Sequence, residues 1–313
     1  MDTIGGYFEL ELRKGQHYHK GALCLNTARN CFEYILLAHK YVKVYIPYYT
    51  CDVMLQPLHK HNVDYEFYHI DKNLEPTELK CLHCNEAFLY TNYFGLKQNY
   101  VEYLADIYKS QLIIDNSQAF YAKSIQDIDT FYSARKFFGV PDGAYLYTNC
   151  FLDIKLEQDK SYMRMQHLLQ RIDEGAEASY SVFRQNEDVL DNQPIKLMSN
   201  LTANLLLNID YKKIKEQRLQ NYKILDDFLS SSNEIKLKIN NDCVPMVYPY
   251  LTNDLSLRKK LIDNRIFVAK YWPNVQLWTE ENAMERKLAD CIIPLPVDQR
   301  YNKNDINIIL SKI

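Results

Sequence analysis

The chain has 313 residues, of which 47% are hydrophobic and 25% are charged, and its formal net charge is −3 at pH 7. These values predict a globular protein of one large domain or two, and the lack of a basic excess argues against nucleic-acid binding. No apolar run reaches the roughly 18 residues that a membrane-spanning helix needs. Residues 1–15 lack the basic and apolar regions of a signal peptide, so we expect a cytoplasmic protein with no membrane partner.

The first 150 residues alternate between short apolar segments and segments with a helical pattern. The predicted strands are Ala22–Leu25, Val42–Ile46, Tyr65–Ile70, Ala87–Thr91, Leu112–Asp115, Phe131–Tyr132 and Tyr145–Thr148. The predicted helices are Asn30–Lys40, Cys51–His61 and Tyr100–Lys109. This alternation predicts an α/β domain with a mostly parallel central sheet, in which ligands gather at the carboxyl ends of the strands.

The pattern changes after Cys150 and predicts a smaller α+β domain at the C-terminus. The predicted helices are Leu156–Arg184, Asn200–Leu229, Leu255–Asn264, Glu280–Cys291 and Asn304–Lys312, and the predicted strands are Ile235–Ile239, Pro245–Leu251 and Ile266–Tyr271. We place the boundary within the long second helix of this set, which gives domains of residues 1–209 and 210–313.

Eight cysteines are scattered along the chain, which at this length is typical of reduced thiols rather than of a disulfide framework. Cys81 and Cys84 have the spacing of a zinc-binding pair. A structural zinc site needs four ligands, and no second such pair follows. We therefore predict no metal site.

The segment Leu25–Asn30 joins a predicted strand to a predicted helix. The free N–H groups at a helix N-terminus favour phosphate, so this turn is a candidate phosphate site. Thr27 is also a good helix N-cap, which would explain it without a ligand. The chain contains no glycine-rich nucleotide-binding motif.

Asp115 and Gln118 lie at the end of a buried apolar strand. A carboxylate in that position is costly unless it is paired or hydrogen-bonded. Asp115 could cap the following turn, or it could face a cationic pyridine nitrogen, which would favour the protonated ring of pyridoxal. Gln118 is close enough in sequence to reach the hydroxyl of the same ring.

Ser133 and Lys136 precede a Gly-Val-Pro-Asp-Gly turn. A lysine that forms a Schiff base needs an amine that is available near neutral pH, and Ser133 could bind a cofactor phosphate. The same Ser-x-x-Lys spacing occurs in serine acylases, but their companion motifs are absent here.

These segments follow one another in the order found in fold type I pyridoxal phosphate enzymes, and the chain resembles the DegT/StrS family of sugar aminotransferases. The matching segments are LNTARN, VYIPYYTCDVMLQPL, FYHID, YTNYFG, LIIDNSQAFYA, YSARKFFGVPDGAYLYTN and IIPLPVDQRY. The resemblance implies a fold type I transferase with a large α/β domain and a small C-terminal domain. It also implies a homodimer with its active sites at the interface.

The resemblance implies a role for each candidate residue around pyridoxal 5′-phosphate. Thr27, Ala28 and Ser133 would bind the phosphate. Asp115 would pair with the pyridine nitrogen, and Gln118 would lie beside the ring oxygen.

Lys136 would form the Schiff base and then move the proton during the reaction. At the position of the family's ring-stacking residue this chain has Cys51, with Tyr48 and Tyr49 nearby. Ile195 and Leu197 stand in the segment where the family supplies an asparagine to the neighbouring subunit.

Other polar residues have two interpretations that the sequence does not separate. Arg29 and Arg135 could grip a diphosphate or form ion pairs. His17, Tyr18 and His19 could line the entrance of a nucleotide-sugar site or lie exposed on the surface.

The sequence therefore predicts an aminotransferase. The amino donor is expected to be an amino acid, most simply glutamate, and the acceptor a nucleotide-linked keto-sugar of surface polysaccharide or lipopolysaccharide synthesis. Two alternatives remain: a pyridoxal phosphate enzyme with a non-sugar keto substrate, and a non-catalytic homologue that binds a sugar nucleotide or a partner.

Overall fold

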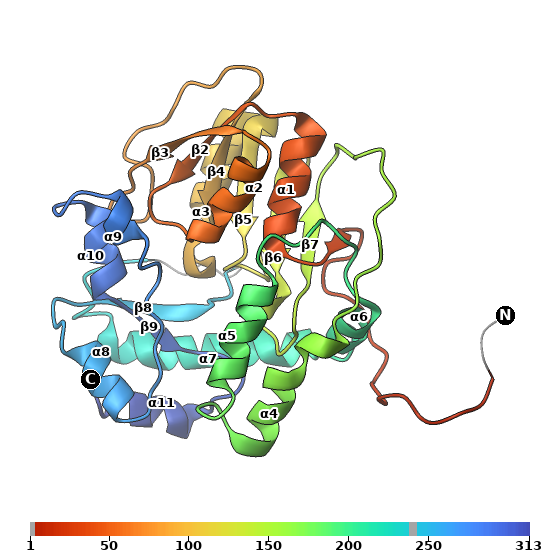
Figure 1. The fold of residues 1–313 in the computed structure, drawn as a ribbon. Coiled ribbons are helices and arrows are strands. Elements are labelled where there is room, and N and C mark those ends of the chain that lie inside the picture. Colours follow the sequence, from red (N-terminus) through yellow and green to blue (C-terminus); the bar gives the residue numbers. More distant parts are fainter. Residues whose placement is uncertain (1–3, 238–242) are drawn as a thin grey trace.

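The computed structural model describes residues 4–237 and 243–313 and contains a seven-stranded sheet (Figure 1). Its strands are β1 (Leu23–Leu25), β2 (Lys43–Pro47), β3 (Asp64–Tyr68), β4 (Glu86–Thr91), β5 (Leu112–Asn116), β6 (Asp129–Ser133) and β7 (Ala144–Tyr147). The strand order is β1-β7-β6-β5-β4-β2-β3. Strands β2 to β6 are parallel, whereas β7 is antiparallel to both of its neighbours. The predicted α/β fold with a mostly parallel sheet is confirmed.

Helices cover both faces of this sheet. Alternate residues of a strand point to opposite faces. Accordingly, Phe88 and Tyr90 of β4 belong to one buried cluster and Ala87 and Leu89 to another. The first cluster includes residues of α3 (Gln98–Tyr108), and the second includes residues of α1 (Ala28–His39) and α2 (Leu55–Lys60).

The elements after β7 lie together below the sheet in the view of Figure 1. They are α4 (Gln166–Glu174), α5 (Tyr180–Val189), α6 (Asn200–Leu207), α7 (Tyr211–Leu229), β8 (Val247–Leu251), α8 (Leu257–Asp263), α9 (Val275–Trp278), α10 (Met284–Cys291), β9 (Ile292–Pro296) and α11 (Lys303–Leu310). Strands β8 and β9 form a separate antiparallel pair. The division into domains at residues 209 and 210 stays a prediction.

The long helix predicted for Asn200–Leu229 is two helices. Helix α6 ends at Leu207, and α7 begins after Asp210, whose side chain accepts a hydrogen bond from the Lys213 amide (3.1 Å). An aspartate is a favoured N-cap because its oxygen satisfies a free amide of the first turn. The chain therefore changes direction where the sequence pattern predicted a continuous helix.

The strand prediction for Ile266–Tyr271 is wrong. The Ala269 carbonyl accepts a hydrogen bond from the Arg258 side chain instead of from a neighbouring strand. The partner of β8 is β9, which the sequence pattern did not predict. Of the strand predicted for Ile235–Ile239, residues 238 and 239 lie outside the described residues, and 235–237 do not form a strand.

Within the described residues, no helix is long and apolar enough to cross a membrane. The same part of the chain holds no group of three or more histidine, cysteine or carboxylate side chains arranged to bind a metal ion. All eight cysteines have free thiols, and Cys81 and Cys84 are exposed.

Candidate active site

The candidate residues come together because their strands point the same way. Asp115 lies near the carboxyl end of β5, and Ser133 is the last residue of β6. Strand β1 runs in the same direction, since it is antiparallel to β7, which is antiparallel to β6. Thr27, which follows β1, therefore lies at the same edge of the sheet as Asp115 and Ser133.

Lys136 ends a short turn, Ala134–Lys136, which we call the Lys136 turn. The Ala134 amide donates to the Gly143 carbonyl (3.0 Å), and the Gly143 amide donates to the Asn26 carbonyl (2.6 Å). These bonds tie the Lys136 turn to the segment that precedes Thr27. The Lys136 side chain is exposed and makes no hydrogen bond or ion pair within the described residues, so its amine is available for reaction.

The Gly139–Gly143 turn is held in place by a buried carboxylate. The Asp142 side chain is fully buried and accepts hydrogen bonds from Arg164 (Nε, 3.1 Å) and from the Thr202 hydroxyl. Gly143 has φ +105°, and a Cβ there would lie 2.7 Å from Cγ2 of Thr202. Glycine is therefore required at this position. The sequence analysis missed this network, for which only the Pro-Asp-Gly turn was a local signal.

Asp115 is a buried carboxylate with few partners. Its side chain accepts hydrogen bonds from the Ser117 amide (2.8 Å) and the Thr91 hydroxyl (3.4 Å). Burial raises the pKa of Asp115 above its usual range, while the Ser117 hydrogen bonds and the positive charge of Lys136 oppose that rise. A cationic group placed against Asp115 would relieve the cost of burying its charge.

Gln118 is held in one orientation. It is 1% exposed, and its Oε1 accepts a hydrogen bond from the Phe94 amide (2.8 Å). Its amide nitrogen makes no hydrogen bond to the described residues. Gln118 can therefore donate to a ligand oxygen.

The two predicted phosphate-binding hydroxyls differ in their partners. Thr27 caps α1: its Oγ1 accepts from the Asn30 amide (3.1 Å) and donates to Oδ1 of Asn30 (2.6 Å). The Ser133 hydroxyl has no hydrogen-bond partner within the described residues. A phosphate at this edge would thus meet the free hydroxyl of Ser133 and the N–H groups that begin α1 at Ala28.

Cys51 lies beside Lys136 after the end of β2. Burial raises the pKa of the Cys51 thiol, and the positive charge of Lys136 opposes this rise. The ring of Tyr48 stacks on Phe67 (centroids 4.6 Å apart), and the ring of Tyr49 meets Trp272 edge-on (4.7 Å). These contacts direct both tyrosine rings to other neighbours and leave Cys51 as the member of this segment next to the candidate site.

The remaining candidates of the sequence analysis have structural partners. Arg29 donates to Gln56 (2.7 Å) and pairs with Asp191 (2.9 Å), and Arg135 pairs with Glu187. The ion-pair interpretation of both arginines is therefore correct in this structure.

His19 is buried rather than exposed, with Nε2 at 2.8 Å from the Phe120 carbonyl. Leu197 forms a backbone bridge with Leu25 of its own chain.

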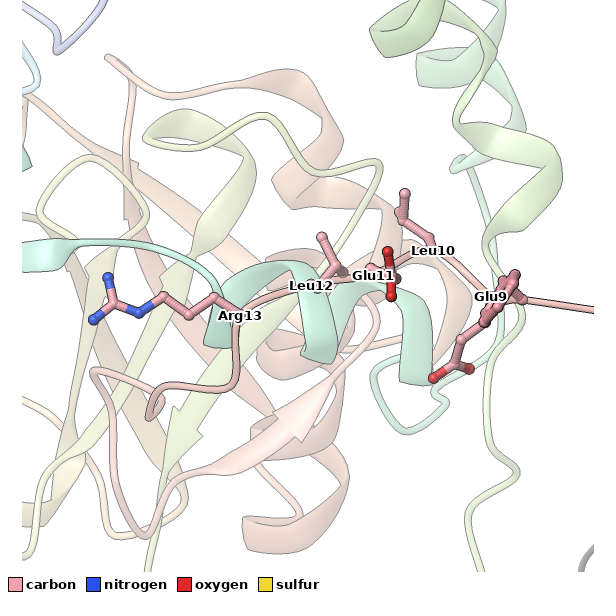
Figure 2. Close-up of a pocket in the computed structure, with 6 residues that line it drawn as sticks. Glu9, Leu10, Glu11, Leu12 and Arg13 are labelled. Atoms are coloured by element: carbon pink, nitrogen blue, oxygen red, sulfur yellow. The ribbon is translucent and has the colours of Figure 1, made fainter.

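A surface pocket elsewhere is formed by the N-terminal arm, Phe8–Arg13 (Figure 2). Figure 2 shows the side chains of Glu9 and Leu10 on opposite sides of the extended arm. The arm is attached near the end of α6, where the Arg13 amide donates to Asn208 Oδ1 (3.1 Å). None of the candidate residues lines this pocket, so it is not the candidate active site.

Comparison with solved structures finds the same fold in aminotransferases. The chain is similar to the sugar aminotransferase CalS13 from Micromonospora echinospora (TM-score 0.65, 13% identity, 93% of this chain and 86% of that chain). It is also similar to NtdA from Bacillus subtilis with bound cofactor PMP (0.65, 13%, 93% and 72%) and to DesV from S. venezuelae in complex with a ketimine intermediate (0.62, 13%, 96% and 84%). No protein-family model and no curated protein matches the sequence.

At 13% identity the likeness to these structures establishes the fold. The predicted fold, type I with a central mostly parallel sheet, is therefore confirmed. The residues present also fit pyridoxal phosphate, because an available amine, a buried carboxylate, a free hydroxyl and an oriented amide share one edge of the sheet.

Proposed function

We propose that this protein is a pyridoxal-phosphate-dependent aminotransferase. The observation that carries the proposal is the available amine of Lys136 at the same sheet edge as the buried carboxylate of Asp115. The fold, shared with sugar aminotransferases, supports it.

Each candidate residue has a defined part in holding the cofactor. Ser133 and the first amides of α1, from Ala28 on, would bind the phosphate. Asp115 would face the pyridine nitrogen, and the free amide of Gln118 would donate to the ring oxygen. Cys51 would contact the face of the ring.

When bound, pyridoxal phosphate supplies the electron sink on which transamination depends. Asp115 would favour the protonated pyridine nitrogen, because a carboxylate stabilises a neighbouring cation. The Lys136 amine would hold the cofactor covalently. Its Nζ, which makes no hydrogen bond within the described residues, would also be available to accept and return a proton.

For the substrates, we propose an amino-acid donor, glutamate, and a nucleotide-linked keto-sugar as acceptor in surface polysaccharide or lipopolysaccharide synthesis in the cytoplasm. The similarity to sugar aminotransferases supports a sugar acceptor over other keto compounds. The donor and acceptor would react in turn at one site, which predicts ping-pong kinetics.

We also propose a homodimer. Large apolar side chains between residues 151 and 172 are more than half exposed: Phe151, Ile154, Tyr162, Met163, Leu169 and Ile172. Exposed apolar side chains that lie together mark interaction surfaces. Glu187, further along this segment, pairs with Arg135 of the Lys136 turn, so a second copy that covers this segment would lie close to the candidate site.

The test is an absorbance spectrum of the purified protein with pyridoxal phosphate, before and after borohydride. We expect a band that differs from that of the free cofactor, and reduced cofactor on the peptide that contains Lys136. Lys136→Ala should lose both, whereas Lys109→Ala should keep both, since Lys109 is an exposed surface residue.

Glutamate should then convert the bound cofactor to its amine form, and a panel of keto acceptors should reverse the conversion. Reversal by keto acids alone would favour a non-sugar substrate. A spectrum of free cofactor only, unchanged by Lys136→Ala, would overturn the enzyme proposal and favour a non-catalytic binding protein.

A further inference from the structure

Arg218, in the middle of α7, is a fully buried cation. It is 1% exposed and makes no ion pair within the described residues. Burying a guanidinium is costly unless its donors are hydrogen-bonded. Burial lowers the pKa of Arg218 to about 10, so the side chain stays charged at neutral pH.

The two terminal nitrogens of Arg218 donate to backbone carbonyls, whereas its Nε is buried without a hydrogen-bond partner within the described residues. Nη1 donates to Pro245 (3.2 Å) and Met246 (3.1 Å), and Nη2 donates to Phe137 (3.4 Å). The guanidinium also lies 4.5 Å from the centre of the Phe137 ring, at a distance typical of a cation–π contact. One side chain thus joins the segment before β8 to the residue that directly follows Lys136.

The Phe137 carbonyl has a second donor from the C-terminal part of the chain. Nε2 of Gln299, in the loop after β9, lies 2.7 Å from the same oxygen. Phe137 thereby connects the Lys136 turn to two segments more than 80 positions further along the chain. Within the described residues, the Gln299 side chain makes no other hydrogen bond.

We call the Arg218 hydrogen bonds to Pro245, Met246 and Phe137 the Arg218 link. From Met246, further hydrogen bonds lead to Gln118. The Met246 amide donates to the Phe94 carbonyl (2.8 Å), and the Phe94 amide donates to Oε1 of Gln118 (2.8 Å). Arg218 therefore links the residue that follows Lys136 to the segment that orients Gln118.

We infer that Arg218 is a positioning residue that couples the C-terminal part of the chain to the Lys136 turn and to Gln118. The inference rests on the proposed function for its meaning in catalysis. Arginine fits this geometry because the two terminal nitrogens of its planar fork reach two different segments, whereas a lysine ammonium offers a single nitrogen. Arg218→Lys should therefore restore the link only in part.

The experiment compares Arg218→Met and Arg218→Lys with Asn233→Ala in the cofactor-free protein. Asn233 is the control: it follows α7, is buried, and donates to the Pro249 carbonyl (2.9 Å), while its Oδ1 accepts from the amides of Leu251 (2.9 Å) and Ile235 (3.2 Å). Within the described residues it makes no hydrogen bond to the Lys136 turn. Its loss should lower stability without loosening that turn.

The readout is amide hydrogen exchange of residues 134–138, followed by titration with pyridoxal phosphate. Arg218→Met should speed exchange there by about tenfold and weaken cofactor binding by a similar factor, as expected for losing hydrogen bonds from a charged donor. Arg218→Lys should show a smaller change in both. Asn233→Ala should leave both within about twofold of the parent protein.

Equal exchange in Arg218→Met and Asn233→Ala would overturn the inference, since it would make Arg218 a general stabiliser. Should Arg218→Met not fold, Gln299→Ala provides the same comparison, because its side chain donates to the Phe137 carbonyl. Faster exchange confined to residues 134–138 supports the inference, and exchange equal to that of the control overturns it. Exchange is measured without cofactor, so a protein that never binds pyridoxal phosphate would refute the proposed function and leave this test readable.

Discussion

The side chains at the carboxyl ends of β5 and β6 differ in burial and in hydrogen bonding. Asp115 and Gln118 are buried and held by hydrogen bonds from Ser117 and Phe94. Lys136 is exposed and has no such partner within the described residues. The groups that would recognise the cofactor ring are thus oriented in advance, whereas the group that would react is left free.

Of these residues, we expect Asp115 to lower the stability of the cofactor-free protein and Lys136 to have no effect on it. The charged form of Asp115 is disfavoured by burial, and the positive charge of Lys136 and the Ser117 hydrogen bonds offset this only in part. Within the described residues, Lys136 makes no hydrogen bond or ion pair that its replacement could remove. A substitution of Lys136 should therefore lower the reaction rate without changing stability. A substitution of Asp115 should lower the reaction rate and raise stability.

The largest effect is expected for Lys136→Arg, which keeps the charge but removes the reactive amine. The rate of amine transfer should fall by about 10³-fold or more, because both the covalent anchor and the proton carrier are lost. The unfolding temperature should not change. Stopped-flow absorbance with glutamate and thermal unfolding measure the two quantities.

A second lysine provides the control for that experiment. Lys97 is buried and pairs with Glu75. Lys97→Ala should lower stability and leave the rate of the first half-reaction largely unchanged. If Lys136→Arg instead unfolds the protein, the amine has a structural role and the comparison with Asp115 fails.

Asp115→Asn should lower the rate by about 10²-fold, the size expected for losing one oriented electrostatic contact. It should also stabilise the cofactor-free protein at pH 7 by roughly 1 kcal/mol. The sign follows from the raised pKa of Asp115: the carboxyl favours folding below its unfolded pKa near 4, and this contribution is lost as pH rises through the folded pKa.

Urea unfolding of the cofactor-free protein at several pH values checks this prediction. The advantage of Asp115→Asn should vanish at acidic pH, where the aspartate is protonated in both states. A variant that is less stable than the parent at pH 7 would mean that the carboxylate is needed for folding rather than for the cofactor.

The sheet, and the edge at which Asp115 and Lys136 lie, could be predicted because both depend on local sequence patterns. Asp115 follows an apolar run, and Lys136 follows the next strand along the chain. Parallel strands then bring their ends together without further information. The expectation that Thr27 caps α1 also came from the local sequence and is confirmed.

The Asp142–Arg164–Thr202 network and the Arg218 link could not be predicted in this way. Their partners are separated by 22 to 81 positions and follow no period. The strand errors have a related cause. Ile266–Tyr271 and Ile292–Pro296 are both apolar, and only the second finds a partner, because β8 can pair with one of them.

His19 is a buried titratable residue for which we propose no catalytic role. Burial lowers its pKa to about 4, so the folded protein keeps it neutral where the unfolded chain takes up a proton. The contribution of His19 to the free energy of unfolding is present above pH ~6.5. It is lost as pH falls toward 4, by up to about 3 kcal/mol. His19→Gln should flatten this acid-side loss in urea unfolding.

The same slope in parent protein and His19→Gln would show that another buried group causes the acid-side loss.

The smallest effects are expected for the two hydroxyl residues near the proposed phosphate site, Thr27 and Ser133. Thr27→Ala should cost about 1 kcal/mol of stability, because it removes the cap of α1. Ser133→Ala should leave stability unchanged and weaken the binding of pyridoxal phosphate by roughly tenfold, the value of one hydrogen bond to a charged group. Fluorescence titration and thermal unfolding of both variants provide the comparison. If Ser133→Ala lowers stability and not affinity, its hydroxyl belongs to the scaffold and the phosphate is held by the amides of α1 alone.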